Sequence, residues 1–126
     1  MEMVTNAVNW FEIPVGDFER AKTFYSKIFD YDMPTHQMGK VMMGFMLFEQ
    51  GKGIGGAIVR GEGLEPSPQG TIAYLNGGED LTVVLNRVED AGGKVLVPKT
   101  QITPEIGFFA MFHDTEGNRV ALHSMK

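Results

Sequence analysis

Two stretches of the chain place apolar side chains three and four residues apart, which predicts amphipathic helices. The first is GDFERAKTFYSKIFDYD, residues 16–32, and the second is EDLTVVLNRVEDAGGK, residues 79–94. Asp17 can cap the first helix because its carboxylate accepts from free backbone N–H groups. Pro34 prevents that helix from continuing, and Gly92 and Gly93 end the second. The predicted apolar faces comprise Phe18, Ala21, Phe24, Tyr25 and Ile28 in the first helix, and Leu81, Val84, Leu85, Val88 and Ala91 in the second.

The other apolar stretches are shorter and predict strands. In the first half they are NWFEIPV (9–15), KVMMGFMLFEQ (40–50) and IGGAIVR (54–60), and the last two are joined by the glycine-rich turn GKG. In the second half they are TIAYLNG (71–77), KVLVPKT (94–100), GFFAMFHD (107–114) and NRVALHS (118–124). Between the halves, the glycines and prolines of GEGLEPSPQG, residues 61–70, are typical of a linker.

The order of these elements repeats, and so do some of the residues. GFMLFEQGKGIGGAIV and GFFAMFHDTEGNRVALH both open on Gly-Phe and then run strand, turn, strand. Each half is a strand, a helix and about three more strands. We therefore predict a single domain over residues 1–126, built as a first module of about 4–60, a linker at 61–69 and a second module of about 70–126.

Composition and charge exclude several classes of protein. The net charge is −5 and no run of lysine or arginine occurs, which argues against nucleic acid and anionic membranes as partners. Without cysteine there are no disulfides, thiolate metal sites or cysteine nucleophiles. No apolar stretch reaches the ~20 residues that span a bilayer, and the amino terminus lacks the pattern of a signal peptide. We expect a cytoplasmic protein.

Three motifs resemble those of the vicinal oxygen chelate superfamily, which includes glyoxalase I, the bleomycin-resistance proteins and the extradiol dioxygenases. They are VGDFERAKTFY at the first helix, AGGKV after the second, and DTEGN in the last hairpin. The resemblance covers nearly the whole chain and is strongest to small single-domain glyoxalase-related proteins. It implies an α+β fold in which two tandem βαβββ modules form a curved mixed sheet around a cleft. It also implies a homodimer.

The resemblance implies a divalent metal ion in the cleft of the enzymes, held by His, Glu or Gln. The corresponding positions here fall on Trp10, about Gly56, about Thr71, and Ala121. Tryptophan, glycine and alanine offer no donor atom, and a threonine hydroxyl is a poor lone ligand. We therefore expect neither a metal nor another cofactor in this chain.

The stretch HDTEGN, residues 113–118, crowds together residue types that bind metals. Its acids and its Gly-Asn pair are equally typical of a tight turn, because Asp, Gly and Asn favour turn backbone geometry. The full calcium-loop pattern is absent. We interpret the stretch as the turn of the final hairpin, with His113 at its solvated rim.

Strand alternation selects the residues that would face the cleft. On the first strand Phe11 and Ile13 would pack on the helices, while Trp10 and Glu12 face the cleft. On the last strand Val120 and Leu122 would face the helices. The candidates are Trp10, Thr71, Arg119 and Ala121 for ligand binding, and Glu12 and His123 as catalytic acid or base. Each has a structural alternative: Trp10 as core filler, Glu12 in an ion pair with Arg119, and His123 in solvent.

Three functions remain open from these residues. The first is a small-molecule-binding protein of this superfamily that works without the divalent metal. The second is a lyase, isomerase or related enzyme acting on a small carbonyl or hydroxy-acid substrate, with Glu12 or His123 transferring a proton. The third is an interaction module without a ligand. A mostly apolar cleft with a few polar anchors favours the first.

Overall fold

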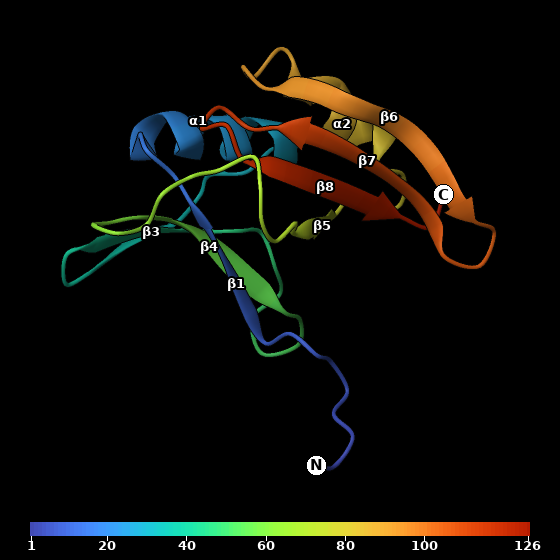
Figure 1. The fold of residues 1–126 in the computed structure, drawn as a ribbon, viewed down its shortest axis with the longest axis horizontal. Helices are drawn as coiled ribbons and strands as arrows, with labels where there is room; N and C mark the ends of the chain where they lie inside the picture. Colours follow the sequence, from blue (N-terminus) through green and yellow to red (C-terminus); the bar gives the residue numbers. More distant parts are fainter.

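The computed structural model describes all 126 residues and contains two four-stranded mixed sheets with two helices (Figure 1). The elements of the first module are β1 (Trp10–Pro14), α1 (Phe18–Phe29), β2 (Thr35–Met38), β3 (Val41–Phe45) and β4 (Gly55–Arg60). Those of the second are β5 (Tyr74–Asn76), α2 (Thr82–Val88), β6 (Lys94–Thr103), β7 (Gly107–His113) and β8 (Arg119–Ser124). No helix is long and apolar enough to cross a membrane.

The two sheets have the same topology, which confirms the predicted α+β fold with a repeated module. Their strand orders are β1-β4-β3-β2 and β5-β8-β7-β6. In each module the first strand along the chain pairs in parallel with the fourth: β1 with β4, where Trp10 lies opposite Gly55, and β5 with β8, where Tyr74 lies opposite Ala121. All other pairs are antiparallel. β1 and β5 are therefore both edge strands.

Three element boundaries differ from the prediction. Strand β2 was not predicted, because THQM is polar and all four residues are exposed. Strand β3 ends at Phe45, and residues 46–54 form a long loop before β4. The GKG sequence lies within this loop and is not a tight turn that joins two strands directly. Helix α2 has only seven residues, and Leu81 at its N-cap position has no side-chain oxygen, so the Thr82 N–H donates instead to the Asp80 carboxylate at 2.9 Å.

Helix α1 forms as the sequence predicts. Asp17 has an extended backbone at the N-cap, and its carboxylate accepts from the Arg20 backbone N–H at 3.1 Å. Asp30 ends the helix in the left-handed conformation, with φ 54°. The predicted apolar face is buried at Ala21, Phe24, Tyr25 and Ile28. The helix is thus fixed at both ends and along one side.

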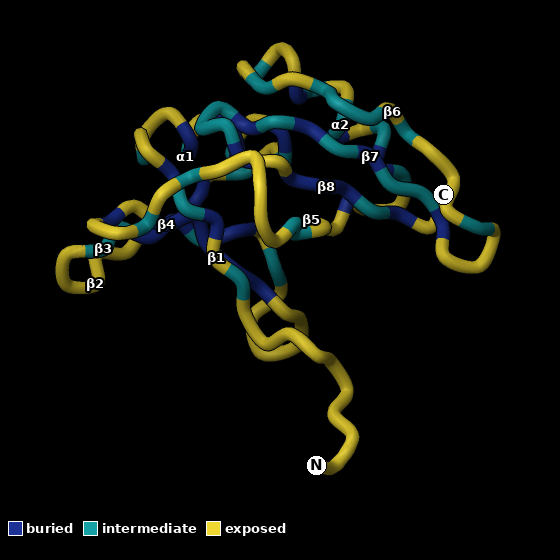
Figure 2. The backbone as a smooth tube through the Cα atoms, in the orientation of Figure 1, coloured by how far each residue is buried: buried dark blue, intermediate teal, exposed yellow.

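One hydrophobic core runs through both modules, and Figure 2 shows buried segments in helices and strands of both. Ile13 of β1 and Ile58 of β4 join it from the first sheet, and Phe112 of β7 and Leu122 of β8 from the second. Phe24 of α1 packs against Phe112 with ring centroids 5.8 Å apart. Ile13, Val120 and Leu122 belong to this core whereas Ala121 does not, which confirms the predicted helix-facing sides of β1 and β8.

The turn between β7 and β8 has buried polar residues at both ends, Asp114 and Asn118. Asp114 is 5% exposed, and its Oδ1 accepts from the backbone N–H groups of Glu116 and Asn118. Its Oδ2 accepts from the Tyr25 hydroxyl of α1 at 2.8 Å. Burial, with the nearby Asp114 carboxylate, raises the pKa of Tyr25. The prediction that His113 is solvated is wrong, because its Nε2 is buried and has no hydrogen-bond partner.

Glu116 of the same turn holds the start of α1. Its side chain is 0% exposed and accepts from the backbone N–H groups of Gly16 and Asp17, at 3.0 and 2.7 Å. The Arg20 guanidinium donates to both carboxylate oxygens, at 2.7 and 3.1 Å. A carboxylate is stabilised there because the free N–H groups and dipole of a helix start are electropositive. Burial opposes this charge, but the hydrogen bonds from Arg20, Asp17 and Thr115 lower the pKa of Glu116 to about 2.

Asn118 completes this link between the modules. Its Nδ2 donates to the Pro14 carbonyl at the end of β1, and its Oδ1 accepts from the Ser67 N–H of the connecting segment. Asp114, Glu116 and Asn118 therefore bond the last hairpin to β1, to α1 and to the segment between the modules. We name these three residues the hairpin clasp.

The clasp predicts an acid-sensitive fold. Because the folded-state pKa of Glu116 lies near 2 against an ordinary 4.5, its charge stabilises the fold above pH ~4.5. That contribution, roughly 3 kcal/mol, is lost as pH falls towards 2. In urea unfolding at pH 7, 5 and 3, we expect Glu116→Gln to be less stable at pH 7 and to lose most of this pH dependence. Glu49→Gln, whose partner Lys52 is largely exposed, is the control. Equal pH dependence in Glu116→Gln and the unmodified protein would contradict this assignment.

Candidate functional site

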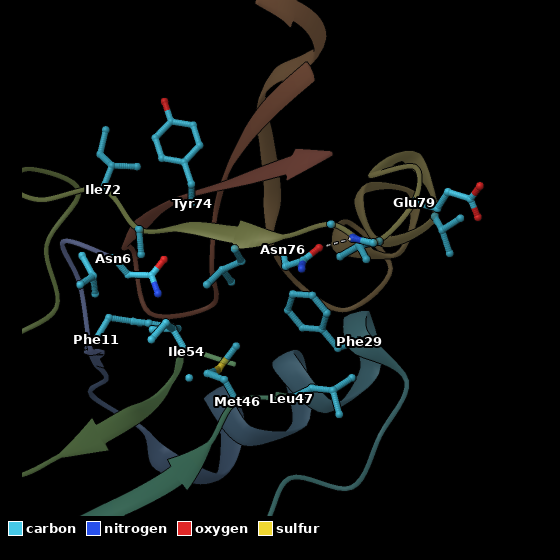
Figure 3. A pocket seen from close by; sticks show the side chains of 18 of the residues that line it. Asn6, Phe11, Phe29, Met46, Leu47, Ile54, Ile72, Tyr74, Asn76 and Glu79 are labelled. Atoms are coloured by element: carbon cyan, nitrogen blue, oxygen red, sulfur yellow. Dashed lines mark hydrogen bonds between the residues drawn. The ribbon is translucent and has the colours of Figure 1, made fainter. Parts of the chain in front are cut away.

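A groove of about 1230 Å³ lies between the two modules (Figure 3). One side comes from the first module: residues 6–8, the start of β1, the end of α1, and the loop that leads into β4. The other side comes from residues 71–80, which include β5, and from the start of α2. Thirteen of its 22 lining residues are hydrophobic, which is typical of a small-molecule site.

The floor of the groove is formed by apolar side chains from elements far apart in the sequence. In Figure 3, Phe11, Met46 and Ile54 lie together below β5, and Phe29 at the end of α1 lies beside Asn76. Phe11 and Phe29 also pack on the main core, which fixes their positions. Ile54 remains 42% exposed, so the groove presents apolar surface to solvent.

The charged residues of the groove are paired at its rim. The Asp80 carboxylate accepts from Lys99 Nζ, and Glu79 accepts from Lys126 Nζ, each at 3.0 Å. Backbone and side-chain hydrogen bonds from Thr82, with one from Lys99, lower the pKa of Asp80 to about 2, so it is ionised at neutral pH. The groove therefore combines an apolar floor with a rim whose charges cancel.

Of the predicted site residues, only Thr71 lines this groove. Trp10 and Glu12 lie on β1 and share the face opposite Phe11, and the indole N–H donates to the Glu12 carboxylate at 3.3 Å. Trp10 is 39% exposed, so it is not core filler, and its ring meets Phe45 and Phe48 edge-on. Glu12 is exposed and therefore lacks the enclosure that would suit it to proton transfer.

Arg119, Ala121 and His123 lie on β8, one strand inward from the groove. Ala121 is 0% exposed and offers no surface to a ligand. His123 is half-buried, and its Nε2–H donates to the Ile106 carbonyl at 2.6 Å. Arg119 forms no ion pair with Glu12. The structure thus separates the candidates onto two sheets, and their functional roles stay predictions.

Sequence reasoning missed most of the groove because its residues lie in irregular segments. Met46 and Ile54 flank a loop whose length was underestimated, and Phe29 is the last residue of a helix. Alternation along strands cannot place such residues. The available signal was the excess of apolar residues at positions 46, 47 and 54, just outside β3 and β4.

The donor set does not fit the divalent metal that the family resemblance implies. A Cβ atom at Gly56 would lie 2.5 Å from the Phe11 carbonyl oxygen, and one at Gly55 would meet the Phe48 ring, so neither position has room for a ligand side chain. Ala121 is covered, and no three His, Asp or Glu side chains gather anywhere in the chain. The residues at these positions therefore do not form a divalent-metal site.

We predict that the protein does not retain Zn²⁺ or Ni²⁺, because these ions need several N, O or S donors within about 2.3 Å. After incubation with excess metal and desalting, elemental analysis should find far less than one equivalent. The melting temperature should not rise. One bound equivalent, together with a rise in melting temperature, would show that a ligand set has been overlooked.

Comparison with known proteins agrees with this architecture. Residues 7–122 match the model of the glyoxalase/bleomycin resistance protein/dioxygenase superfamily. A glyoxylase-like domain-containing protein from Didymella fabae is 31% identical over 119 residues, which cover 91% of each chain. The structure of TnmS3, an antibiotic binding protein from Streptomyces sp. CB03234, superposes with a TM-score of 0.67 at 24% identity, covering 98% of both chains. A glyoxalase I mutant from Zea mays gives a TM-score of 0.70 at 22% identity, over 92% of this chain but 45% of the maize chain. The family match and the fold together place the chain in the glyoxalase/bleomycin resistance protein/dioxygenase superfamily.

Proposed function

We propose that this protein binds an uncharged, largely apolar small molecule in the groove between its modules and does so without a divalent metal. The observation that carries the proposal is the apolar floor of Phe11, Phe29, Met46 and the exposed Ile54 within a groove of about 1230 Å³. Exposed apolar surface in a concave site is a common mark of ligand binding.

Two elements that line the groove, β1 and α1, are hydrogen-bonded to the hairpin clasp. Phe11 belongs to β1, whose end is bonded to the hairpin clasp through the Pro14 carbonyl. Phe29 ends α1, whose start is held by Glu116. A binding surface that is ordered before the ligand arrives loses less conformational entropy on binding. An antibiotic-binding relative with the same fold makes a binding role for this chain reasonable.

An enzyme acting on a small carbonyl or hydroxy-acid substrate is the alternative from the sequence. Neither Glu12 nor His123 lines the groove, and they lie on different sheets. The two carboxylates that line the groove, Glu79 and Asp80, are each paired with a lysine, so we favour binding over catalysis.

Pairing of two copies, which the family resemblance implies, is also a proposal. Sedimentation over a range of protein concentrations decides this point independently: a single monomer mass throughout would contradict the homodimer and leave the binding proposal intact.

The neutral dye Nile red tests the proposed binding, because its fluorescence rises in an apolar site. We expect saturable binding that is weakened roughly tenfold or more by Ile54→Glu, because this variant puts an unpaired carboxylate beside the bound dye. Ile102→Glu is the matched control, since Ile102 is 40% exposed and lies outside the groove. Equal dye affinity in the two variants would contradict binding in the groove.

A further inference from the structure

The free edge of β5 faces away from the rest of its sheet. The Ala121 N–H donates to the Ala73 carbonyl at 3.0 Å, and the Gly77 N–H donates to the His123 carbonyl at 2.8 Å. Backbone groups of successive strand residues point to opposite edges. The N–H and C=O groups of Tyr74 and Asn76 must therefore point away from β8, and the structure gives these four groups no hydrogen-bond partner.

That free edge forms a wall of the groove. Every residue from Thr71 to Asp80 lines it, although the side chains of neighbouring strand residues point to opposite faces. When consecutive residues of a strand all line the same cavity, the cavity lies against the edge of the strand, where their backbone groups are accessible, and not over one of its faces. Figure 3 agrees, since β5 crosses the view above Phe11, Ile54, Met46 and Phe29. An apolar floor thus lies beside a row of free backbone donors and acceptors.

We propose that the ligand of this groove is an uncharged compound with an extended secondary-amide backbone, which adds to the free edge of β5 as a further strand. The inference deepens the proposed function and depends on it. An amide N–H and C=O in extended geometry complement the paired donor and acceptor that Tyr74 presents. The alternate substituents of such a backbone would meet the apolar floor.

The charge distribution favours an uncharged ligand. The two acids at the rim already bind lysines, Asp80 with Lys99 and Glu79 with Lys126. A cationic ligand would meet carboxylates whose charge is already balanced by lysines, and an anionic one would approach those two carboxylates. The free backbone N–H and C=O groups of β5 would instead orient an uncharged ligand through hydrogen bonds between neutral groups.

The strand geometry allows one backbone donor to be removed selectively. Proline is tolerated at the first residue of a strand and at edges where the N–H faces outward, and Tyr74 meets both conditions. Tyr74→Pro removes the outward N–H without removing a bond to β8. Tyr74→Val also removes the phenol ring but keeps the N–H, so it is the matched reference.

The probe is acetyl-Val-Phe-Val-amide, and its partner is the same peptide N-methylated at the phenylalanine. Displacement of Nile red measures the affinity of both. We expect the parent peptide to bind, N-methylation to weaken it, and Tyr74→Pro to bind it about five- to tenfold more weakly than Tyr74→Val, the effect of one hydrogen bond. In hydrogen exchange, the Tyr74 and Asn76 amides should become protected only with the parent peptide. Unchanged protection of the Ala121 amide would confirm that Tyr74→Pro keeps its sheet.

The outcomes separate the two proposals. If Nile red binds but both peptides bind equally, and Tyr74→Pro matches Tyr74→Val, the strand-addition inference is overturned while groove binding stands. If neither dye nor peptide binds, the proposed function itself is wrong. If the Tyr74 and Asn76 amides are protected without peptide, increasingly so at higher protein concentration, a second copy occupies the edge and the ligand inference is overturned.

Discussion

The fold depends on the contact between the Glu116 carboxylate and the start of α1. This carboxylate is 0% exposed. It accepts hydrogen bonds from the backbone N–H groups of Gly16 and Asp17 at the helix start, and it forms an ion pair with Arg20. It belongs to the last hairpin, whereas the helix belongs to the first module, about 100 residues earlier. The neighbouring Asp114 and Asn118 bind Tyr25, Pro14 and Ser67. Buried polar groups need such partners, so the two modules must keep one relative position to satisfy them.

The groove follows from that fixed position. Once α1 is bonded to the second module, its last residue, Phe29, lies next to β5, and β1 brings Phe11 to the same space. The parallel pairing of β5 with β8 leaves its other edge free. An apolar floor and an unpaired strand edge therefore lie side by side. Unpaired edges invite another extended chain, and we infer that a ligand meets this one.

The periodic parts of the structure could be predicted from the sequence. The three- and four-residue spacing in α1, its Asp17 cap and the alternation along β1 and β8 all report local geometry, and the structure confirms them. The family motifs predicted the repeated topology of the two modules. The role of Glu116 could not be predicted, because DTEGN suits a local turn equally well and only the tertiary fold brings it to Gly16 and Asp17. The groove was missed for the same reason, since its residues meet only in three dimensions.

The proposed ligand site lies in the groove between the modules and not on the sheet faces that carry Trp10 and His123. Nuclear magnetic resonance with isotope-labelled side chains tests this directly during a titration with Nile red. We predict that the largest shifts occur at the methyl groups of Ile54, Met46 and Leu75, while the indole of Trp10 and the ring of His123 stay unchanged. Shifts centred on Trp10 or His123, with the groove methyl groups unaffected, would contradict it.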